Sequence, residues 1–342
     1  MTLFFVRLRG VATSRAIWTM SLLAAMLGMS LYVRAAEDSG SPSGTQAFAT
    51  GATIPLGEVR GRIDHLAIDV ARQRLYVAEL GNDTVGVIDL AQRKTIRTLT
   101  GFKEPQGIAY VPSTDTVYIA NAGDGSVRLF HGADLTRAGQ IALGSDADNV
   151  RVNEDGSRVF VGFGEGALAV IDSKTQQKVG EIALKAHPES FRLERSGPRI
   201  FVNVPDARSI TVVDRSSNKE ITNWQTGSLR ANFPLALDEA GHVIAVFRHP
   251  ARVGVFQAQD GRLMSSSDTC DDSDDVFVDA KRHRLYVICG EGFIDTFAQD
   301  GDSFRRLARL STQVYLYRCR SSIAMEAQSL PSCRNYAPQV RG

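Results

Sequence analysis

Carboxylate and amide side chains recur along this chain at a nearly constant spacing. Asp64, Gln106 and Asp148 follow one another at intervals of 42 residues, and Glu189 comes 41 residues after Asp148. Asp274 lies 85 residues beyond Glu189, which is two such intervals. Carboxylates brought close together repel one another unless a cation or shared protons stabilise them, and ligand sets made of oxygen atoms suit Ca²⁺ or Mg²⁺. We call these five residues the entry-loop set.

The elements that must position this set are short strands that repeat with the same period. Each repeat is marked by an aliphatic residue followed by a second apolar, usually aromatic residue, and the second members lie 41 to 43 residues apart. The six pairs are Leu75-Tyr76, Val117-Tyr118, Val159-Phe160, Ile200-Phe201, Val243-Ile244 and Leu285-Tyr286. In the first repeat, strands are expected over 66–69, 74–79, 84–89 and 95–99, separated by polar turns. Repeats of about 42 residues with four short strands predict an all-β propeller made of four-stranded blades.

The ends of the chain decide the predicted number of blades. Residues 54–64 match residues 96–106 in spacing, so they predict a fourth strand with no blade before it. Such a strand closes the last blade of a ring and removes open sheet edges. Six full repeats plus this strand predict a seven-bladed propeller over residues 51–312, with the last blade closed by the N-terminal strand. Residues 313–342 break the pattern, so this tail is either a divergent last blade or a frameshifted segment that leaves the C-terminal blade defective.

The N-terminus is typical of an export signal. Arg7, Arg9 and Arg15 precede an uncharged, mostly apolar run over residues 17–33, and small residues follow before position 36. An uncleaved membrane anchor is the alternative, because 17 residues is near the lower limit for crossing a bilayer. The favoured interpretation is a signal peptide over residues 1–35 and a flexible linker over 36–50. It predicts a periplasmic or secreted protein with no membrane span after cleavage.

Charge and cysteine content narrow the partners and the compartment. Four arginines and no acidic residue in 1–35 leave residues 36–342 with a net charge of −3, out of a total of +1. This balance gives no support for a nucleic-acid partner. Cys270 precedes the first strand of the sixth repeat and Cys289 ends its second strand, at the same end of the blade. An oxidising compartment therefore predicts a disulfide between them, and two free thiols are the alternative.

The propeller geometry gathers the candidate site residues on one face. The loops that enter each blade's first strand open on the same side as the loops between second and third strands, so together they predict one polar, acidic rim. In the fifth repeat the position equivalent to the entry-loop set is Asn232 or Phe233. The predicted ligand-binding residues of the rim are Asp64, Gln106, Asn149, Asn232 and His249. His65 and His187 map to the same side and are the candidate catalytic bases. A wet pore that binds nothing specific is the alternative.

One repeat resembles a known family. Leu75-Tyr76-Val77-Ala78-Glu79, followed by Asn82-Asp83-Thr84-Val85 and Val87-Ile88-Asp89, is similar to the repeat of YVTN-type propeller proteins. The resemblance covers residues 51–312 and implies an exported, seven-bladed repeat protein, in a family whose roles are mostly undefined. Related propellers include lactonases, which hold a divalent cation near the axis. Their ligand set is imitated here by Asp148, Asn149, Glu189 and Asp274.

The expected function follows from the motifs that the chain lacks and from the rim. The sequence holds no GxSxG, HExxH or dinucleotide fingerprint. We therefore expect a scaffold that binds a small molecule or a periplasmic protein, and catalysis stays open. The alternative is a metal-dependent, lactonase-like hydrolase, in which a central Ca²⁺ or Mg²⁺ polarises the ester carbonyl and a base activates water.

Overall fold

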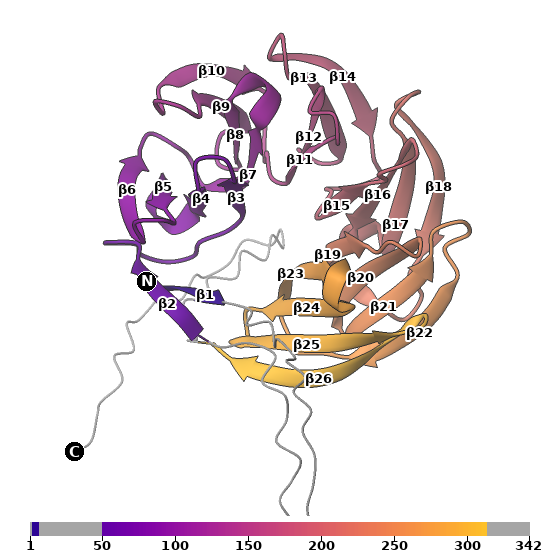
Figure 1. Cartoon of the computed structure of the whole chain (residues 1–342). Coiled ribbons are helices and arrows are strands. Elements are labelled where there is room, and N and C mark those ends of the chain that lie inside the picture. The colour runs from indigo at the N-terminus through magenta and orange to yellow at the C-terminus, as the bar shows by residue number, and fades with distance from the viewer. Residues whose placement is uncertain (1, 7–49, 313–342) are drawn as a thin grey trace, which may run out of the picture.

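The computed structural model describes residues 2–6 and 50–312. Its four-stranded sheets are all antiparallel and stand around a common axis, so that the chain runs once around a ring (Figure 1). An all-β propeller of four-stranded blades is thus confirmed. Neighbouring strands within each blade follow one another in sequence, because short polar turns join them.

The first three blades cover residues 66–183. Blade one consists of β3 (Leu66–Asp69), β4 (Arg74–Glu79), β5 (Thr84–Asp89) and β6 (Lys94–Leu99). Blade two consists of β7 (Pro105–Val111), β8 (Thr116–Asn121), β9 (Ser126–His131) and β10 (Arg137–Ala142). Blade three consists of β11 (Val150–Val152), β12 (Arg158–Phe163), β13 (Ala167–Asp172) and β14 (Gln177–Ala183).

The next three blades cover residues 191–311. Blade four consists of β15 (Phe191–Leu193), β16 (Arg199–Val204), β17 (Ser209–Asp214) and β18 (Lys219–Gln225). Blade five consists of β19 (Arg230–Leu237), β20 (His242–His249), β21 (Ala251–Gln257) and β22 (Leu263–Asp268). Blade six consists of β23 (Ser273–Asp279), β24 (Arg284–Cys289), β25 (Phe293–Asp300) and β26 (Ser303–Ser311). Four of the connections contain 3-10 turns, at η1 (Leu80–Asn82), η2 (Pro112–Thr114), η3 (Pro205–Ala207) and η4 (Ala280–Arg282).

The core consists of the interfaces between neighbouring blades. Side chains along a strand alternate between the two faces of its sheet, so the repeated residue pair serves both neighbours. Val159 packs with Tyr118 of blade two, whereas Phe160 packs with Phe191 of blade four. The repeated spacing of these pairs therefore reflects one interface that recurs around the ring. Tyr286, the aromatic member in blade six, is only half-buried, since no further four-stranded sheet follows it within residues 2–6 and 50–312.

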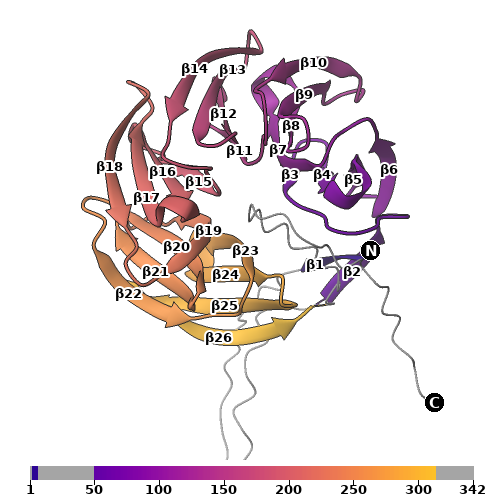
Figure 2. The same ribbon diagram turned by 180° about the vertical axis from the view of Figure 1, so that it is seen from behind.

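The sector between blade six and blade one is built differently (Figures 1 and 2). Here β2 (Thr50–Pro55) pairs in antiparallel fashion with β1 (Thr2–Val6), forming a two-stranded sheet. Ile54 and Leu56 pack against the apolar face of blade one, and the Pro55 carbonyl accepts a hydrogen bond of 3.0 Å from Thr95 Oγ1 on β6. The strand expected at Ile54 is therefore present, and it lies beside the outer strand of blade one.

The prediction of seven blades is wrong for the described residues, which form six. The seventh blade needed inner strands from residues 313–342, and these lie outside the described residues. The N-terminal strand pairs with β1 rather than with strands of a last blade. β1 itself belongs to the segment predicted as a signal peptide, whose remaining residues and nearly all of the predicted linker also lie outside the described part.

Candidate functional site

The inner strands hold the entry-loop set at equivalent positions around the axis. Asp64, Asp148 and Glu189 each lie two residues before the first paired residue of their inner strand. Gln106 and Asp274 lie within β-bulges at the start of β7 and β23. The spacing between repeats varies by a residue, and the bulges take up this difference. Gln106 and Asp274 therefore still align with Asp64, Asp148 and Glu189.

Side chains from blades that are not neighbours meet at the centre of the ring. His65 of blade one places Nε2 3.9 Å from Asp64 Oδ1 and 4.0 Å from Asp148 Oδ1 of blade three. Arg192 of blade four places Nη2 3.8 Å from Asp275 Oδ1 of blade six. The His65–Asp148 contact skips blade two, and the Arg192–Asp275 contact skips blade five. Both contacts must therefore cross the axial region. The side chains of His65, Arg192 and Asp275 keep 17%, 22% and 25% of their surface exposed, which leaves them within reach of a solute.

Two arginines supply counter-charges to this cluster. Arg62 Nη2 lies 2.7 Å from Asp64 Oδ2, and Arg248 Nη2 lies 2.7 Å from Asp274 Oδ1. Arg248 also stacks over Phe233, with its guanidinium carbon 3.8 Å from the ring centroid. These pairings could not be predicted from the sequence, because repeat spacing locates a residue on the ring but not the direction in which a long side chain extends.

Burial and crowding change the protonation of the acidic residues. Burial raises the pKa of Asp148 well above its ordinary value, and the charges of Asp64 and Glu189 raise it further. The pKa of Glu189 is raised mainly by burial, although His187 and Arg248 oppose the shift. Burial raises the pKa of Asp274 to about 6, against the opposing influence of Arg248. Burial thus shifts all three carboxyl groups toward their protonated forms.

A second pair of arginines occupies equivalent positions on adjacent blades. Arg151 on β11 pairs in register with Phe160, and Arg192 on β15 pairs in register with Phe201. Burial, together with the charge of the neighbouring Arg192, lowers the pKa of Arg151 to about 9, although Asp275 and Asp148 oppose the shift. Burial also lowers the pKa of Arg192. We call Arg151 and Arg192 the arginine pair. The pair was not predicted from the sequence, because only the acidic positions of the repeats were aligned.

His65 lies between the acidic residues and the arginine pair. Its pKa is lowered mainly by burial, and the charges of Arg151 and Arg192 lower it further, while Asp64 and Asp275 oppose them. The imidazole is therefore neutral at neutral pH. A neutral imidazole can donate one hydrogen bond and accept another.

The two asparagines predicted at the rim are both buried. Asn149 is 3% exposed, and its Oδ1 has no hydrogen-bond partner in the described part of the chain. Asn232 is fully buried and donates from Nδ2 to Asn203 Oδ1 and to the Ser209 carbonyl, both at 2.9 Å. Asn232 therefore ties blade five to blade four. The pairing register assigns the position equivalent to the entry-loop set to Phe233, which lies in the bulge of β19.

The remaining predicted residues lie at different depths. His187 contacts the Gly164 carbonyl through Nδ1 at 2.6 Å, with Asp146 Oδ2 at 3.5 Å. His249 is exposed at the end of β20. Gln106 is half-buried. The structure thus separates His187 and His249 from His65, whose contacts lie with Asp64 and Asp148.

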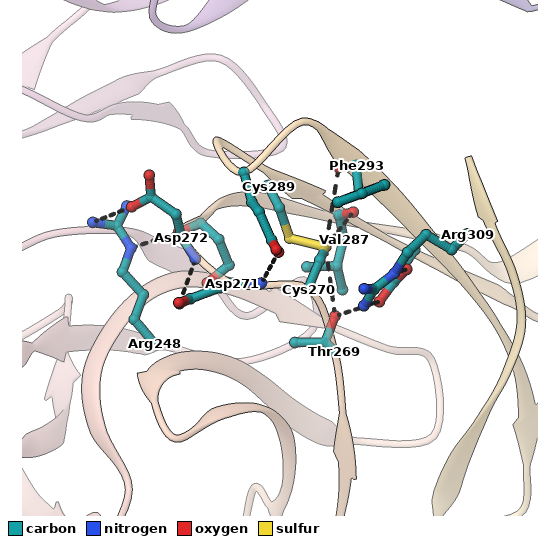
Figure 3. Close-up of a disulfide and its surroundings, with 12 residues drawn as sticks. Arg248, Thr269, Cys270, Asp271, Asp272, Val287, Cys289, Phe293 and Arg309 are labelled. Atoms are coloured by element: carbon teal, nitrogen blue, oxygen red, sulfur yellow. Dashed lines mark hydrogen bonds and ion pairs between the residues drawn. A yellow bond between two sulfur atoms is a disulfide. The ribbon is translucent and has the colours of Figure 1, made fainter. Parts of the chain in front are cut away.

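A disulfide anchors the acidic loop of blade six (Figure 3). Cys270 and Cys289 are joined, with Cα atoms 6.0 Å apart. The segment that follows Cys270 contains Asp272 in the loop and Asp274 at the start of β23, and both pair with Arg248. The covalent bond therefore limits the freedom of the segment that holds these two carboxylates beside the axis.

The predicted metal site stays untested by the structure. Nowhere within 2–6 and 50–312 do three His, Cys, Asp or Glu side chains come together as a group able to hold a metal ion. Arg62 and Arg248 already compensate Asp64 and Asp274. The ligand set of Asp148, Asn149, Glu189 and Asp274 stays a prediction.

The fold defines this chain as a β-propeller protein. It matches no known family description, and no curated protein matches it. Among solved structures it is similar to a chain of Kuenenia stuttgartiensis hydrazine synthase, at 15% identity and a TM-score of 0.65. The similarity covers 72% of this chain and 86% of that one; at this identity it shows the fold alone. Within the described part of the chain, no helix is long and apolar enough to cross a membrane.

Proposed function

We propose that this chain is an exported propeller scaffold that binds a small ligand or a periplasmic protein at the axial end of its inner strands. One observation carries the proposal: polar side chains from blades one, three, four and six converge there while staying partly exposed. Rigid sheets hold each of them in place. Such convergence of polar groups on a fixed frame is the general property of ligand sites.

Unsatisfied polar atoms support the same proposal. Asp148 Oδ1 and Asn149 Oδ1 are buried and have no hydrogen-bond partner in the described residues. A buried polar atom without a partner costs about 1–3 kcal/mol, so a ligand that supplies the missing hydrogen bonds would recover part of this cost. A scaffold that carries this cost in its free form is suited to binding.

A thermal-shift screen of the purified protein tests this function. The panel comprises amino acids, carboxylic acids, sugars and lactones, and a ligand at a hundred times its Kd stabilises a protein by about 2.7 kcal/mol. At least one compound should raise the Tm of the wild type and of Asp300→Asn, an exposed control, but not of Asp148→Ala. A panel that leaves the wild-type Tm unchanged, repeated with a pull-down that recovers no specific periplasmic protein, would contradict the proposal.

Metal-dependent, lactonase-like hydrolysis is the second candidate. Its support is the pair of unsatisfied oxygens on Asp148 and Asn149, which are atoms of the kind that Ca²⁺ prefers. No group of three His, Cys, Asp or Glu side chains able to hold a metal ion is found in the described residues, so we derive no catalytic step through a cation. Elemental analysis of the purified protein, followed by lactone turnover with and without chelator, tests this candidate. Absence of both bound metal and turnover would remove it.

We also propose that the ring is sevenfold, with β2 as the outer strand of the seventh sector, as the YVTN-type resemblance implies. Exposed apolar side chains on the two blade faces that border this sector support the sevenfold ring. Leu66 and Ile68 of blade one are 45% and 49% exposed, and Phe277 of blade six is 50% exposed. The residue equivalent to Leu66 in blade three, Val150, is 2% exposed. Truncation after Thr312 should lower the Tm if later residues cover these faces, and an unchanged Tm would refute the proposal.

A further inference from the structure

Arg151, the first member of the arginine pair, has no ion-pair partner among the described residues. Arg151 donates from Nη1 to the carbonyl of Val150 at 2.8 Å, and its Nε is buried without a hydrogen-bond partner in the part of the chain that the structure describes. Carboxylate oxygens are the usual partners of a buried guanidinium, because a charge removed from water must be paired. For Arg151 the described residues provide none within ion-pair distance.

Arg192 is only partly compensated. It donates from Nη1 to the Phe191 carbonyl at 3.3 Å and to Ser190 Oγ at 3.4 Å, which are long hydrogen bonds. Its one acidic neighbour, Asp275, lies 3.8 Å from Nη2, beyond hydrogen-bond distance. Asp275 also accepts a hydrogen bond from the Val276 amide at 2.8 Å. Within the described residues, Nε and Nη2 of Arg192 have no hydrogen-bond acceptor, so these donors are available to a ligand.

The positions of the two arginines bring them toward the same point. They occupy the same register position on β11 and β15, which are the inner strands of adjacent blades. The charge of Arg192 lowers the pKa of Arg151, and the charges of both arginines lower the pKa of His65. Arg151 additionally stacks near Phe191, with its guanidinium carbon 5.9 Å from the ring centroid.

We infer that the arginine pair and His65 form an axial binding site for an oxyanion, either the carboxylate group of a small organic molecule or a phosphate. Two guanidinium forks supply the N–H donors that match carboxylate and phosphate oxygens. His65 adds a neutral donor beside them. Burial raises the pKa of Asp148, whose charge also acts on Arg151, and this shift toward the protonated form reduces its repulsion of an anion.

This inference deepens the proposed function by giving the ligand a chemical class, and it rests on that function for access to the axis. It differs from the metal hypothesis in the charge of the ligand. Here the unpaired charge of the protein is positive, so the ligand is an anion rather than a cation. The site also differs in its residues, since neither Arg151 nor Arg192 belongs to the predicted rim. Occupation by an anion would restore both pKa values toward that of an ordinary arginine.

Calorimetric titration of the full-length purified protein tests the site, with sodium phosphate and sodium acetate as separate probes at constant ionic strength. Arg151→Gln and Arg192→Gln should each weaken saturable binding about 10-fold or more, as expected for loss of a charged hydrogen bond. Arg305→Gln, the same change at an exposed position of β26, should leave it unchanged. Asp275→Asn should tighten binding, because it removes the acid that competes for Arg192.

The pH dependence and the two probes give independent readouts. Binding should weaken as the pH rises through about 9, where Arg151 loses its proton. Binding of phosphate alone identifies a tetrahedral oxyanion as the ligand group, and binding of acetate identifies a carboxylate; either supports the site. If Arg151→Gln does not fold, Arg151→Lys with Asp275→Asn supplies the test.

Absence of saturable binding for both probes, or binding that is equal in wild type, Arg192→Gln and Asp275→Asn, would overturn the inference. The proposed function can survive this failure. A compound from the thermal-shift panel that binds in an Asp148-dependent but Arg151-independent manner would support a ligand site at the entry-loop set and refute the oxyanion site.

Discussion

Breaking the disulfide of blade six should cost a measurable and calculable amount of stability. Cys270 and Cys289 are 19 positions apart in the sequence. Closing a loop of about that size restricts the unfolded chain by an entropy worth about 3 kcal/mol at 25 °C. For a domain of this size, 3 kcal/mol corresponds to a fall in Tm of roughly 6–10 °C. Both cysteines are buried, so their truncation to alanine adds a small packing loss.

The assay compares urea unfolding of the oxidised protein, the protein in reductant, and Cys270→Ala/Cys289→Ala. Reduction should lower the free energy of unfolding of the wild type by about 3 kcal/mol and leave the double variant unchanged, since it has no bond to break. Because the loop after Cys270 carries Asp274, reduction should also broaden the NMR signal of that carboxyl. Equal stability of oxidised and reduced wild type would refute the reasoning, as would a reductant effect of the same size on the variant.

Three further predictions concern packing, protonation and export. Gly107→Ala should destabilise the protein by about 1–3 kcal/mol in thermal unfolding, because a Cβ there would lie 2.0 Å from the Asp148 carbonyl oxygen. Gly139→Ala should not, because its Cβ would make only an ordinary contact, 3.9 Å from Gln176 Oε1. The raised pKa of Asp274 means that the folded state takes up a proton as the pH falls from about 6 to 4, so the free energy of unfolding should rise over that window by at most about 1 kcal/mol, because the side chain is half exposed. Asp274→Asn should abolish that rise, and an unchanged slope would contradict the assignment. Mass spectrometry of the exported protein should find Ala36 at the mature N-terminus, and an intact residue 1 would contradict cleavage.

The strands and their ring arrangement could be predicted because both depend on local patterns. Residue pairs such as Val159-Phe160 alternate between two neighbouring blades, so the same pattern recurs wherever the interface does. The shared position of Asp64, Asp148 and Glu189 follows from the same period. The sequence was sufficient for these features because each is fixed within one repeat.

The remaining features depend on contacts that no repeat contains. The choice between Asn232 and Phe233 depended on a bulge in β19, which sequence spacing does not reveal. The arginine pair could not be predicted from the repeat, because only two of the described blades carry arginine at that register position and the pair therefore leaves no periodic signal. The described residues form six blades rather than the predicted seven. Within them the N-terminal strand pairs with Thr2–Val6, a long-range choice that its own residues do not determine.

The most direct test of the central claim, that distant repeats converge at one axial site, is the pKa of His65 measured by NMR. His65 and Arg192 belong to blades one and four, so their interaction exists only if the ring brings them together. The His65 resonance can be assigned with His65→Gln. The account predicts a pKa below the ordinary value in the wild type, a rise in Arg192→Gln, and no change in Arg305→Gln. An ordinary pKa for His65 that does not respond to Arg192→Gln would contradict it.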